Sequence, residues 1–266
     1  MQNLIDKLVS KRLLSKEEFV VLIEKRNADV AEYLFRQARQ VREKNYGKDV
    51  YIRGLIELSN YCKNDCLYCG IRKSNAHVSR YRLDKASILD CCKRGHDLGF
   101  RTFVLQGGED AYYNDKLMVD IISTIKKLYS DSAVTLSLGE KKKETYLAYY
   151  QAGADRYLLR HETANAEHYS LLHPKNMSSE TRKKCLYDLK EIGFQVGSGF
   201  MVGSPYQTVE HLAEDLLFLS DLQPHMIGIG PFMSHHETPF ADKKNGTMEL
   251  TLYMLAILRI MLPGSL

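Results

Sequence analysis

The sequence predicts an α/β fold: a (β/α) barrel of the TIM type, with about six of the eight strand–helix units present and an N-terminal helical extension. Two observations predict this fold. Short β-prone runs alternate with helix-prone segments along most of the chain, and glycine stands at the turn before three of the runs. Alternating strands and helices imply parallel strands joined by right-handed crossovers. The length of 266 residues suits one large domain of this class.

The first part of the chain, residues 1–48, is expected to form the helical extension. Ser15 precedes Glu18 by three positions, which is the pattern of a capping box at a helix start. Apolar residues then recur at helical spacing until Gly47. The barrel core is expected over residues 49–266.

Six β-prone runs are the expected barrel strands. They are Tyr51–Ser59, Thr102–Gln106, Ala133–Leu138, Arg156–Leu159, Gln195–Val202 and Met226–Ile229. Gly99, Gly153 and Gly193 would supply left-handed caps at the helix ends before three of them. A last helix over residues 250–261 is followed by no further strand, so we expect open edges on the first and sixth strands.

Composition and charge narrow the class of protein. There are 37 Lys and Arg residues against 33 Asp and Glu, and no basic stripe, so no nucleic-acid partner is expected. No run approaches the ~18 apolar residues of a membrane helix, and the N-terminus lacks the apolar core of a secretory signal. Of six cysteines, half lie within eight residues, which favours metal ligation over disulfides and a reducing cytoplasm.

The cysteine cluster is the most informative motif, reading Cys62-Lys-Asn-Asp-Cys66-Leu-Tyr-Cys69 after the first strand. Three thiolates leave one iron of a 4Fe-4S cluster open, whereas ferredoxins use four cysteines. The open iron can bind the amino and carboxylate groups of S-adenosylmethionine (SAM), and an electron from the cluster then releases a 5′-deoxyadenosyl radical. A structural zinc site is the alternative, with His77 as the nearby fourth ligand, but zinc favours paired spacing.

The other cysteines and Tyr68 have simpler interpretations. Cys91, Cys92 and Cys185 fall in predicted helices, where cysteine usually behaves as a small buried hydrophobe. They provide no ligands for a second cluster inside the barrel. Tyr68 precedes the last cysteine of the motif, and it could pack on the adenine of SAM or simply in the core.

Polar residues that follow barrel strands are the further candidates, because such folds carry their functional groups there. Gly107 and Gly108 would allow a close backbone approach, and Glu109 could accept from the SAM ammonium, although a lone Gly-Gly pair is more often a turn. Arg156 and Arg160 would share one face of a strand. On an interior face they make a positive pocket for an anion, and on the outer face they make salt bridges with helices.

Three later segments complete the set of candidates. Glu162 could bind the SAM ribose hydroxyls. Arg182 begins a helix and could pair with the SAM carboxylate, although a helix-surface arginine is most often solvated. The segment His235–Pro239 follows the sixth strand and is expected to line the substrate pocket.

Over essentially its whole length the sequence resembles the HydE family, the radical SAM maturases of FeFe-hydrogenase. The cysteine motif alone identifies only the superfamily. More specific are the runs Tyr157–Asn165, Ser137–Glu140 and Gly228–Phe232. The resemblance implies a role in assembling the two-iron subcluster of the hydrogenase (the H-cluster), on an iron–cysteine complex that carries CO and cyanide, with adenosyl attack at sulfur.

The resemblance also implies cofactors, residues and partners. The cofactors are a 4Fe-4S cluster on the three motif cysteines, which are the catalytic and metal-binding residues, and SAM. The expected cofactor-binding residues are Tyr68, Gly107, Gly108, Glu109, Ser137, Glu162, Arg182 and Met226. The expected substrate-binding residues are Gln106, Thr135, Arg156 and Arg160. The implied partners are a small anionic or iron-complex substrate, an electron donor such as ferredoxin or flavodoxin, and, transiently, other hydrogenase maturases.

Other functions remain open beside the maturase. The family has a further C-terminal segment that closes the barrel, and this sequence is expected to lack it. Methylornithine synthase and biotin synthase share the barrel group, and the absence of strand cysteines argues against biotin synthase. An inactive, cluster-binding fragment is the remaining alternative, supported only by the missing strands.

Overall fold

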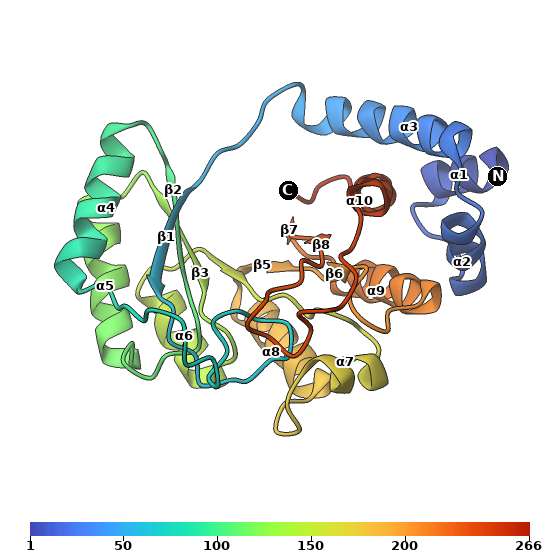
Figure 1. Cartoon of the computed structure of the whole chain (residues 1–266). Coiled ribbons are helices and arrows are strands. Elements are labelled where there is room, and N and C mark those ends of the chain that lie inside the picture. The colour runs from blue at the N-terminus through green and yellow to red at the C-terminus, as the bar shows by residue number, and fades with distance from the viewer.

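The computed structural model describes residues 1–266 and shows a curved parallel sheet with helices on its outer side (Figure 1). Six strands form the sheet in the order β1-β2-β3-β4-β5-β7, and β6 and β8 form a short parallel pair. The strands are β1 (Gly54–Ser59), β2 (Thr102–Gly107), β3 (Ala133–Ser137), β4 (Arg156–Leu158), β5 (Gln195–Ser198), β6 (Met201–Val202), β7 (Met226–Ile227) and β8 (Gly230–Pro231). The predicted class, a partial (β/α) barrel with six strands in one parallel sheet, is confirmed.

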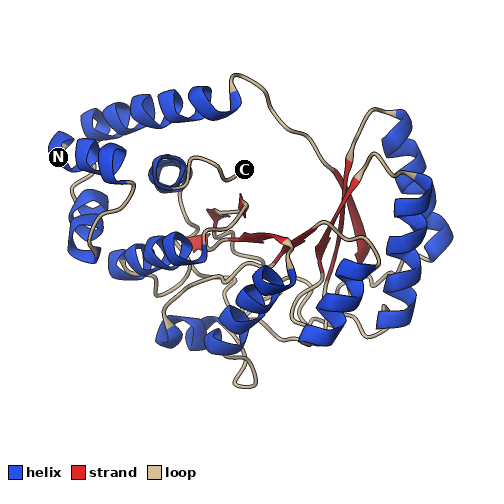
Figure 2. Ribbon diagram, turned by 180° about the vertical axis from the view of Figure 1, so that it is seen from behind, coloured by secondary structure: helices blue, strands red, loops and turns tan.

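Ten helices accompany the strands (Figure 2). They are α1 (Gln2–Lys11), α2 (Lys16–Glu24), α3 (Ala28–Tyr46), α4 (Lys85–Asp97), α5 (Asp115–Leu128), α6 (Lys143–Gln151), α7 (Ala166–Leu172), α8 (Ser179–Ile192), α9 (Val209–Leu222) and α10 (Met248–Met261). Ser15 and Glu18 form the predicted capping box. Gly99, Gly153 and Gly193 have the left-handed φ angles that were predicted, 93°, 106° and 110°.

Two predicted strands are interrupted where their backbones meet. The run Gln195–Val202 breaks at Gly199 and Phe200, and the strand opposite it breaks at Gly228. A Cβ atom on Gly199 would lie 1.9 Å from the Gly228 carbonyl oxygen, so the two strands bend together at this contact. Pairing resumes beyond it between β6 and β8. The first strand is also shorter than predicted, since it begins at Gly54.

The two faces of the sheet differ in chemistry. One set of alternating side chains, including Phe103, Leu105 and Tyr157, is buried against the outer helices in a core of 25 residues. Because successive strand residues point to opposite faces, the residues between them face the concave side. That side carries polar groups, among them Thr135 and Arg156.

The N-terminal helices share a second core with α9 and α10. This core has 24 buried residues, which include Phe19 and Leu22 of α2 together with Leu216 of α9 and Ile257 of α10. In Figure 1 the helices α1–α3 lie beside α9 and α10, and an extended segment leads from α3 across to β1. No helix combines the length and the apolar character needed to cross a membrane.

The two outer edges of the sheet, on β1 and β7, are hydrogen-bonded to different segments of the chain. Among the strands β1 pairs only with β2, but the end of its other edge is partly covered, because the Leu83 amide donates to the Leu58 carbonyl oxygen at 2.8 Å and Arg82 forms an isolated antiparallel bridge with Ser59. The outer edge of β7 is partly covered, because the Ile227 amide donates to the Leu266 carbonyl oxygen at 2.8 Å and the Leu266 amide donates to the His225 carbonyl oxygen at 2.9 Å. The expectation of fully exposed edges on the first and sixth strands is therefore corrected.

Candidate functional site

The three motif cysteines lie on the loop that follows β1. All three are free thiols and are partly buried. Burial raises the pKa of the Cys66 thiol to about 12, and burial also raises the pKa of the Cys69 thiol. Without metal the Cys66 and Cys69 sulfurs are therefore protonated, and binding of a cation would release their protons.

The arrangement of the cysteines bears on the zinc alternative. No group of three or more His, Cys, Asp and Glu side chains is placed to hold one metal ion, with or without His77. A single tetrahedral zinc ion needs such convergence. A cluster in which each thiolate binds its own iron does not need it, so the donor set fits a cluster better.

Arg80 stabilises the cysteine loop through hydrogen bonds to its backbone. Its guanidinium donates to the carbonyl oxygens of Ile71 at 2.9 Å, Arg72 at 2.7 Å and Asn75 at 3.1 Å, and also to that of Asn60. These bonds satisfy backbone groups that an irregular loop would otherwise leave unpaired. No sequence pattern predicts this role, because a single arginine in a polar loop is usually solvated.

Gly108 lies directly against the cysteine loop. A Cβ atom at this position would lie 2.2 Å from the Tyr61 carbonyl oxygen and 2.8 Å from the Cys62 Cβ. The predicted close backbone approach is thus present, and it is made to the loop that bears Cys62. Gly107 is less confined, since a Cβ there would lie 3.2 Å from the Ser59 carbonyl oxygen.

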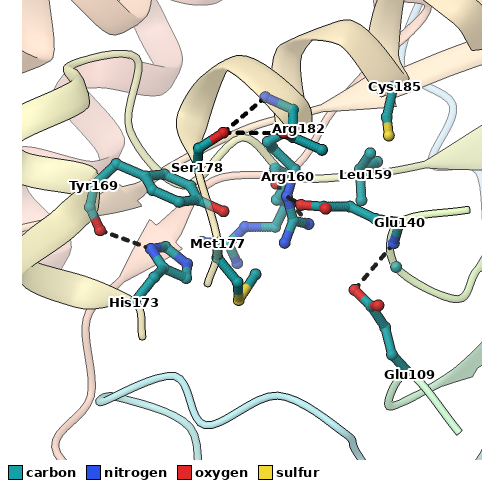
Figure 3. Close-up of polar contacts among 12 residues, drawn as sticks. Glu109, Glu140, Leu159, Arg160, Tyr169, His173, Met177, Ser178, Arg182 and Cys185 are labelled. Atoms are coloured by element: carbon teal, nitrogen blue, oxygen red, sulfur yellow. Dashed lines mark hydrogen bonds and ion pairs between the residues drawn. The ribbon is translucent and has the colours of Figure 1, made fainter. Parts of the chain in front are cut away.

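Glu109 joins the cysteine loop to the loop after β3. Its side chain is 7% exposed, and its Oε2 lies 2.9 Å from the Lys63 Nζ. The Glu140 amide donates to its Oε1 at 3.0 Å, which Figure 3 shows as a dashed line. The carboxylate predicted to accept from the SAM ammonium therefore already has two partners.

Two ion pairs lie close together beyond β4, and Figure 3 labels Arg160, Arg182 and Glu140 among their members. Arg182 of α8 is 8% exposed, and its Nε lies 2.7 Å from the Glu140 Oε1. The Arg160 Nη2 lies 2.9 Å from the Glu162 Oε2, and the Arg182 Nη1 donates to the Arg160 carbonyl oxygen at 3.5 Å. The structure thus brings Arg160, Glu162 and Arg182 together.

Several buried polar atoms near these pairs have no hydrogen-bond partner. They are the Arg160 Nε and the Tyr169 Oη, and the Arg182 Nε meets Glu140 without hydrogen-bond alignment. Buried polar groups in proteins are nearly always paired, so a set of unpaired ones indicates a place where a polar ligand binds. This observation supports a SAM site beside α8.

Glu162 has an unusual backbone conformation. Its φ angle is 64°, in the left-handed region, where a residue other than glycine costs on the order of 1–3 kcal/mol. Its amide donates to the Gly199 carbonyl oxygen at 3.1 Å, and its carbonyl oxygen accepts from the Met201 amide at 3.3 Å. Such strain is found where the surrounding structure fixes a functional side chain.

His173, Tyr169 and Met177 also belong to the site, although sequence reasoning missed them. The His173 Nδ1 lies 2.9 Å from the Tyr169 carbonyl oxygen, so it carries the proton, and the Nε2 accepts from the Tyr68 hydroxyl at 3.2 Å. The Tyr169 ring stacks on His173 at 3.8 Å, and the Met177 Sδ lies 3.9 Å from the Cys66 Sγ. No periodicity or motif marks these three residues.

The predicted substrate residues lie on the concave face, but they do not form one cluster. Arg156 begins β4, where it donates to the Gln195 Oε1 at 2.7 Å and to the Thr102 Oγ1 at 3.2 Å. Burial lowers the pKa of Arg156. Arg160 lies past the other end of β4, so the two guanidinium groups are not side by side. Neither makes a salt bridge with an outer helix, which was the alternative.

The remaining predicted residues are placed as follows. Thr135 is 2% exposed on β3, and Ser137 ends that strand. The Gln106 Nε2 lies 3.4 Å from the Glu57 Oε1. Met226 is 6% exposed and packs over Gly197.

The other cysteines and the last loop complete the comparison with expectation. Cys92 and Cys185 are buried as predicted, whereas Cys91 is exposed because it lies on the solvent side of α4. The loop after β8 reaches the cysteine loop, since the Asn75 Nδ2 donates to the Glu237 Oε2 at 2.8 Å.

Comparison with known proteins places this site in a family context. The sequence profile of the radical SAM superfamily matches residues 56–219. A 234-residue region, 88% of the chain, is 48% identical to the [FeFe] hydrogenase maturase subunit HydE of Thermotoga maritima and spans 66% of that protein, just under two thirds. The 3-methylornithine synthase of Methanosarcina acetivorans is 27% identical over 98% of the chain and 74% of its own length.

Solved structures show the same fold. A crystal structure of methylornithine synthase superimposes with a TM-score of 0.90 at 27% identity, over 99% of this chain and 77% of that one. A crystal structure of HydG, a maturase of the [FeFe]-hydrogenase, superimposes with a TM-score of 0.86 at 24% identity, over 99% of this chain and 62% of that one. The second likeness bears on the fold alone.

Proposed function

The chain belongs to the radical SAM superfamily, and from that premise we propose that it cleaves SAM reductively in assembly of the two-iron subcluster of FeFe-hydrogenase. The observation that carries the proposal is the cysteine loop. Three free thiols follow β1 on a loop that Arg80 braces and against which Gly108 packs. The donor set suits a 4Fe-4S cluster with one iron left for SAM.

Each part of the site has a task in this proposal. Cys62, Cys66 and Cys69 would hold the cluster, which supplies the electron for cleavage of the sulfonium when it is bound. Arg182 would meet the SAM carboxylate and Glu162 the ribose hydroxyls. Lys63 and Glu109 connect the cysteine loop to the β3 loop and fix the distance between them. The half-buried position of the thiols limits access of water.

The maturase role is supported by the similarity to HydE at 48% identity, against 27% for methylornithine synthase. Methylornithine synthase remains the second candidate because its crystal structure superimposes with a TM-score of 0.90. The substrate we propose is small and anionic or an iron complex, bound on the concave face by Gln106, Thr135, Arg156 and Arg160. A ferredoxin or flavodoxin would supply the electron in the cytoplasm, and other maturases would make transient contact.

The test of SAM cleavage uses protein reconstituted anaerobically with iron and sulfide and reduced with dithionite. Formation of 5′-deoxyadenosine and methionine is measured by chromatography. We expect cleavage by the parent and none by Cys66→Ala. Cys185→Ala removes a buried thiol outside the loop and should cleave like the parent. Cleavage by Cys66→Ala at the parent rate contradicts the proposal.

The substrate class is tested separately in the same assay. A synthetic iron–cysteine complex carrying CO and cyanide should raise the rate of SAM cleavage. An unchanged rate would contradict the proposed substrate class and leave the methylornithine synthase alternative as the stronger one.

A further inference from the structure

Asp215 is a fully buried carboxyl group that the proposed chemistry does not use. It lies on α9 with no exposed surface, and its side chain reaches the segment after β4. The Ala164 amide donates to its Oδ1 at 2.5 Å. The same oxygen lies 3.2 Å from the His161 Nε2. One carboxyl oxygen thus holds residues on both sides of Glu162.

His161 is anchored at its other nitrogen as well. Its Nδ1 lies 2.9 Å from the Ser198 Oγ on β5. The Ser198 hydroxyl donates to the Leu159 carbonyl oxygen at 3.1 Å, so it accepts the Nδ1 proton of His161. His161 is 1% exposed, and it therefore links β5 to α9 without reaching solvent.

The pKa values of Asp215 and His161 are both shifted by their burial. Burial raises the pKa of Asp215 well above its usual range and lowers the pKa of His161 to about 3. The two groups therefore share one proton and titrate as a unit. Both side chains are at most 1% exposed, so neither can contact a ligand.

Glu162 stands between these two fixed points in its left-handed conformation. Its side chain is 13% exposed and faces Arg160. A residue other than glycine keeps such a φ angle only when the surroundings over-determine it. Two hydrogen bonds to its own backbone and two anchors on its neighbours provide this constraint.

We propose that Asp215 is a positioning residue, which holds the turn from His161 to Ala164 so that the Glu162 carboxylate is presented to SAM. The proposal rests on the proposed function through the assignment of Glu162 to SAM. It adds a buried residue on α9, far along the chain, that sets SAM affinity without touching SAM.

The experiment compares four variants in the full chain. Asp215→Leu removes both anchors and keeps the branching at Cγ, with methyl groups in place of the two oxygens, and Asp215→Asn keeps an oxygen that can accept from Ala164. Ser198→Ala removes only the second anchor of His161 and serves if Asp215→Leu fails to fold. Leu216→Ala, at a fully buried neighbour on the same helix, is the control for lost stability alone.

Two measurements are made on each variant. The first is the dissociation constant for SAM on reconstituted protein, together with the iron content. The second is amide hydrogen exchange over residues 160–165 in the metal-free protein.

We expect Asp215→Leu to bind SAM at least about 10-fold more weakly with unchanged iron content, and Ser198→Ala to show a smaller loss in the same direction. Asp215→Asn should stay within about 3-fold of the parent, because it keeps the Ala164 bond. In a Glu162→Gln background, Asp215→Leu should cause no further loss, as expected for two residues that act through one contact. Exchange at residues 160–165 should accelerate in Asp215→Leu and stay slow in Leu216→Ala.

The proposal is overturned if Asp215→Leu, or Ser198→Ala in its place, binds SAM like the parent, or if Leu216→Ala weakens SAM binding equally. If Glu162→Gln alone leaves SAM affinity unchanged, the assignment of Glu162 in the proposed function fails instead. The positioning claim is then decided by exchange: acceleration in Asp215→Leu alone supports it, and equal exchange in both variants overturns it.

Discussion

Gly108 shows how one residue without a side chain determines the position of the cysteine loop. Its Cα approaches the loop so closely that a methyl group would lie 2.2 Å from the Tyr61 carbonyl oxygen. The obstacle is backbone, which cannot rotate away as a long side chain can. Gly108 therefore restricts the position of the cysteine loop by its shape.

We predict that Gly108→Ala displaces the loop at Cys62 and costs about 1–3 kcal/mol of unfolding free energy, the usual cost of overpacking. Iron content after reconstitution should fall well below that of the parent. Gly230→Ala is the matched control, because no atom lies within 4 Å of the Cβ it would add. Equal iron content in Gly108→Ala and Gly230→Ala would show that the loop tolerates the methyl group.

At this scale the sequence could predict residues that a local pattern marks. The cysteine spacing predicted a cluster-binding loop, and the structure places the three free thiols on one loop after β1. The resemblance assigned Glu162 and Arg182 to SAM, and the structure places both beside Arg160. Arg80, His173 and Asp215 could not be predicted, because each acts through contacts with segments distant in sequence. The left-handed backbone conformation of Glu162 also could not be predicted from the sequence, because it depends on contacts with distant segments.

Among the elements, β4 separates two arginines that the sequence suggested as one pocket. Arg156 donates hydrogen bonds to the first residues of β2 and β5. Arg160 forms an ion pair with Glu162 close to Arg182 of α8. The strand thus divides the concave face into two positive regions. Arg160 thus lies with Glu162 and Arg182, whereas Arg156 lies at the opposite end of the strand.

We predict that Arg156→Met preserves SAM cleavage and cluster content but weakens binding of an anionic substrate by about 1.5–3 kcal/mol, the value of a charge-assisted contact. Gln195→Ala removes a neutral partner of Arg156 and is the control for local disturbance. Titration with a substrate analogue, followed by calorimetry, measures the change. Equal affinity in Arg156→Met and the parent would remove Arg156 from the substrate site.

The helix α7 region carries two buried histidines with a consequence for acid stability. Burial lowers the pKa of His168 and of His173 to about 4 each. In the unfolded chain a histidine takes up its proton near pH 6.5. Between that pH and about 4 the unfolded state binds more protons than the folded state, so the free energy of unfolding falls as the pH falls.

We predict a loss of up to about 3 kcal/mol per pH unit across this window if both histidines titrate. Denaturant unfolding at several pH values between 7 and 4.5 measures it. His168→Gln should reduce the slope by about half, and His225→Asn, at an exposed position, should leave it unchanged. A slope that His168→Gln does not alter would place the acid sensitivity elsewhere.

Element boundaries were predicted where local signals define them. The capping box at Ser15 and the glycine caps are properties of a few adjacent residues. The break at Gly199 was not predictable, because it follows from contact with Gly228, which lies on another strand.

At the scale of the whole molecule, the N-terminal helices pack against the barrel through a common hydrophobic core. Phe19 has no exposed surface, and α1–α3 share one core with α9 and α10. These contacts favour one cooperative unit, and we propose that residues 1–48 do not unfold separately from residues 49–266.

We predict that Phe19→Ala lowers the unfolding free energy of the entire chain by about 3–5 kcal/mol in a single transition. Leu128→Ala, with 56% of its side chain exposed, should change it by less than about 0.5 kcal/mol. Calorimetry distinguishes the outcomes. A separate low-temperature transition in Phe19→Ala would show that the helical extension is an independent domain.

The central claim is that Cys62, Cys66 and Cys69 hold a 4Fe-4S cluster with one iron open to SAM. The most direct measurement is electron paramagnetic resonance of the anaerobically reconstituted, reduced protein, with metal content determined on the same sample. The account predicts about four irons per chain and a reduced-cluster signal whose shape changes when SAM is added. Tightly bound zinc without iron, or a cluster signal that SAM leaves unchanged, would contradict it.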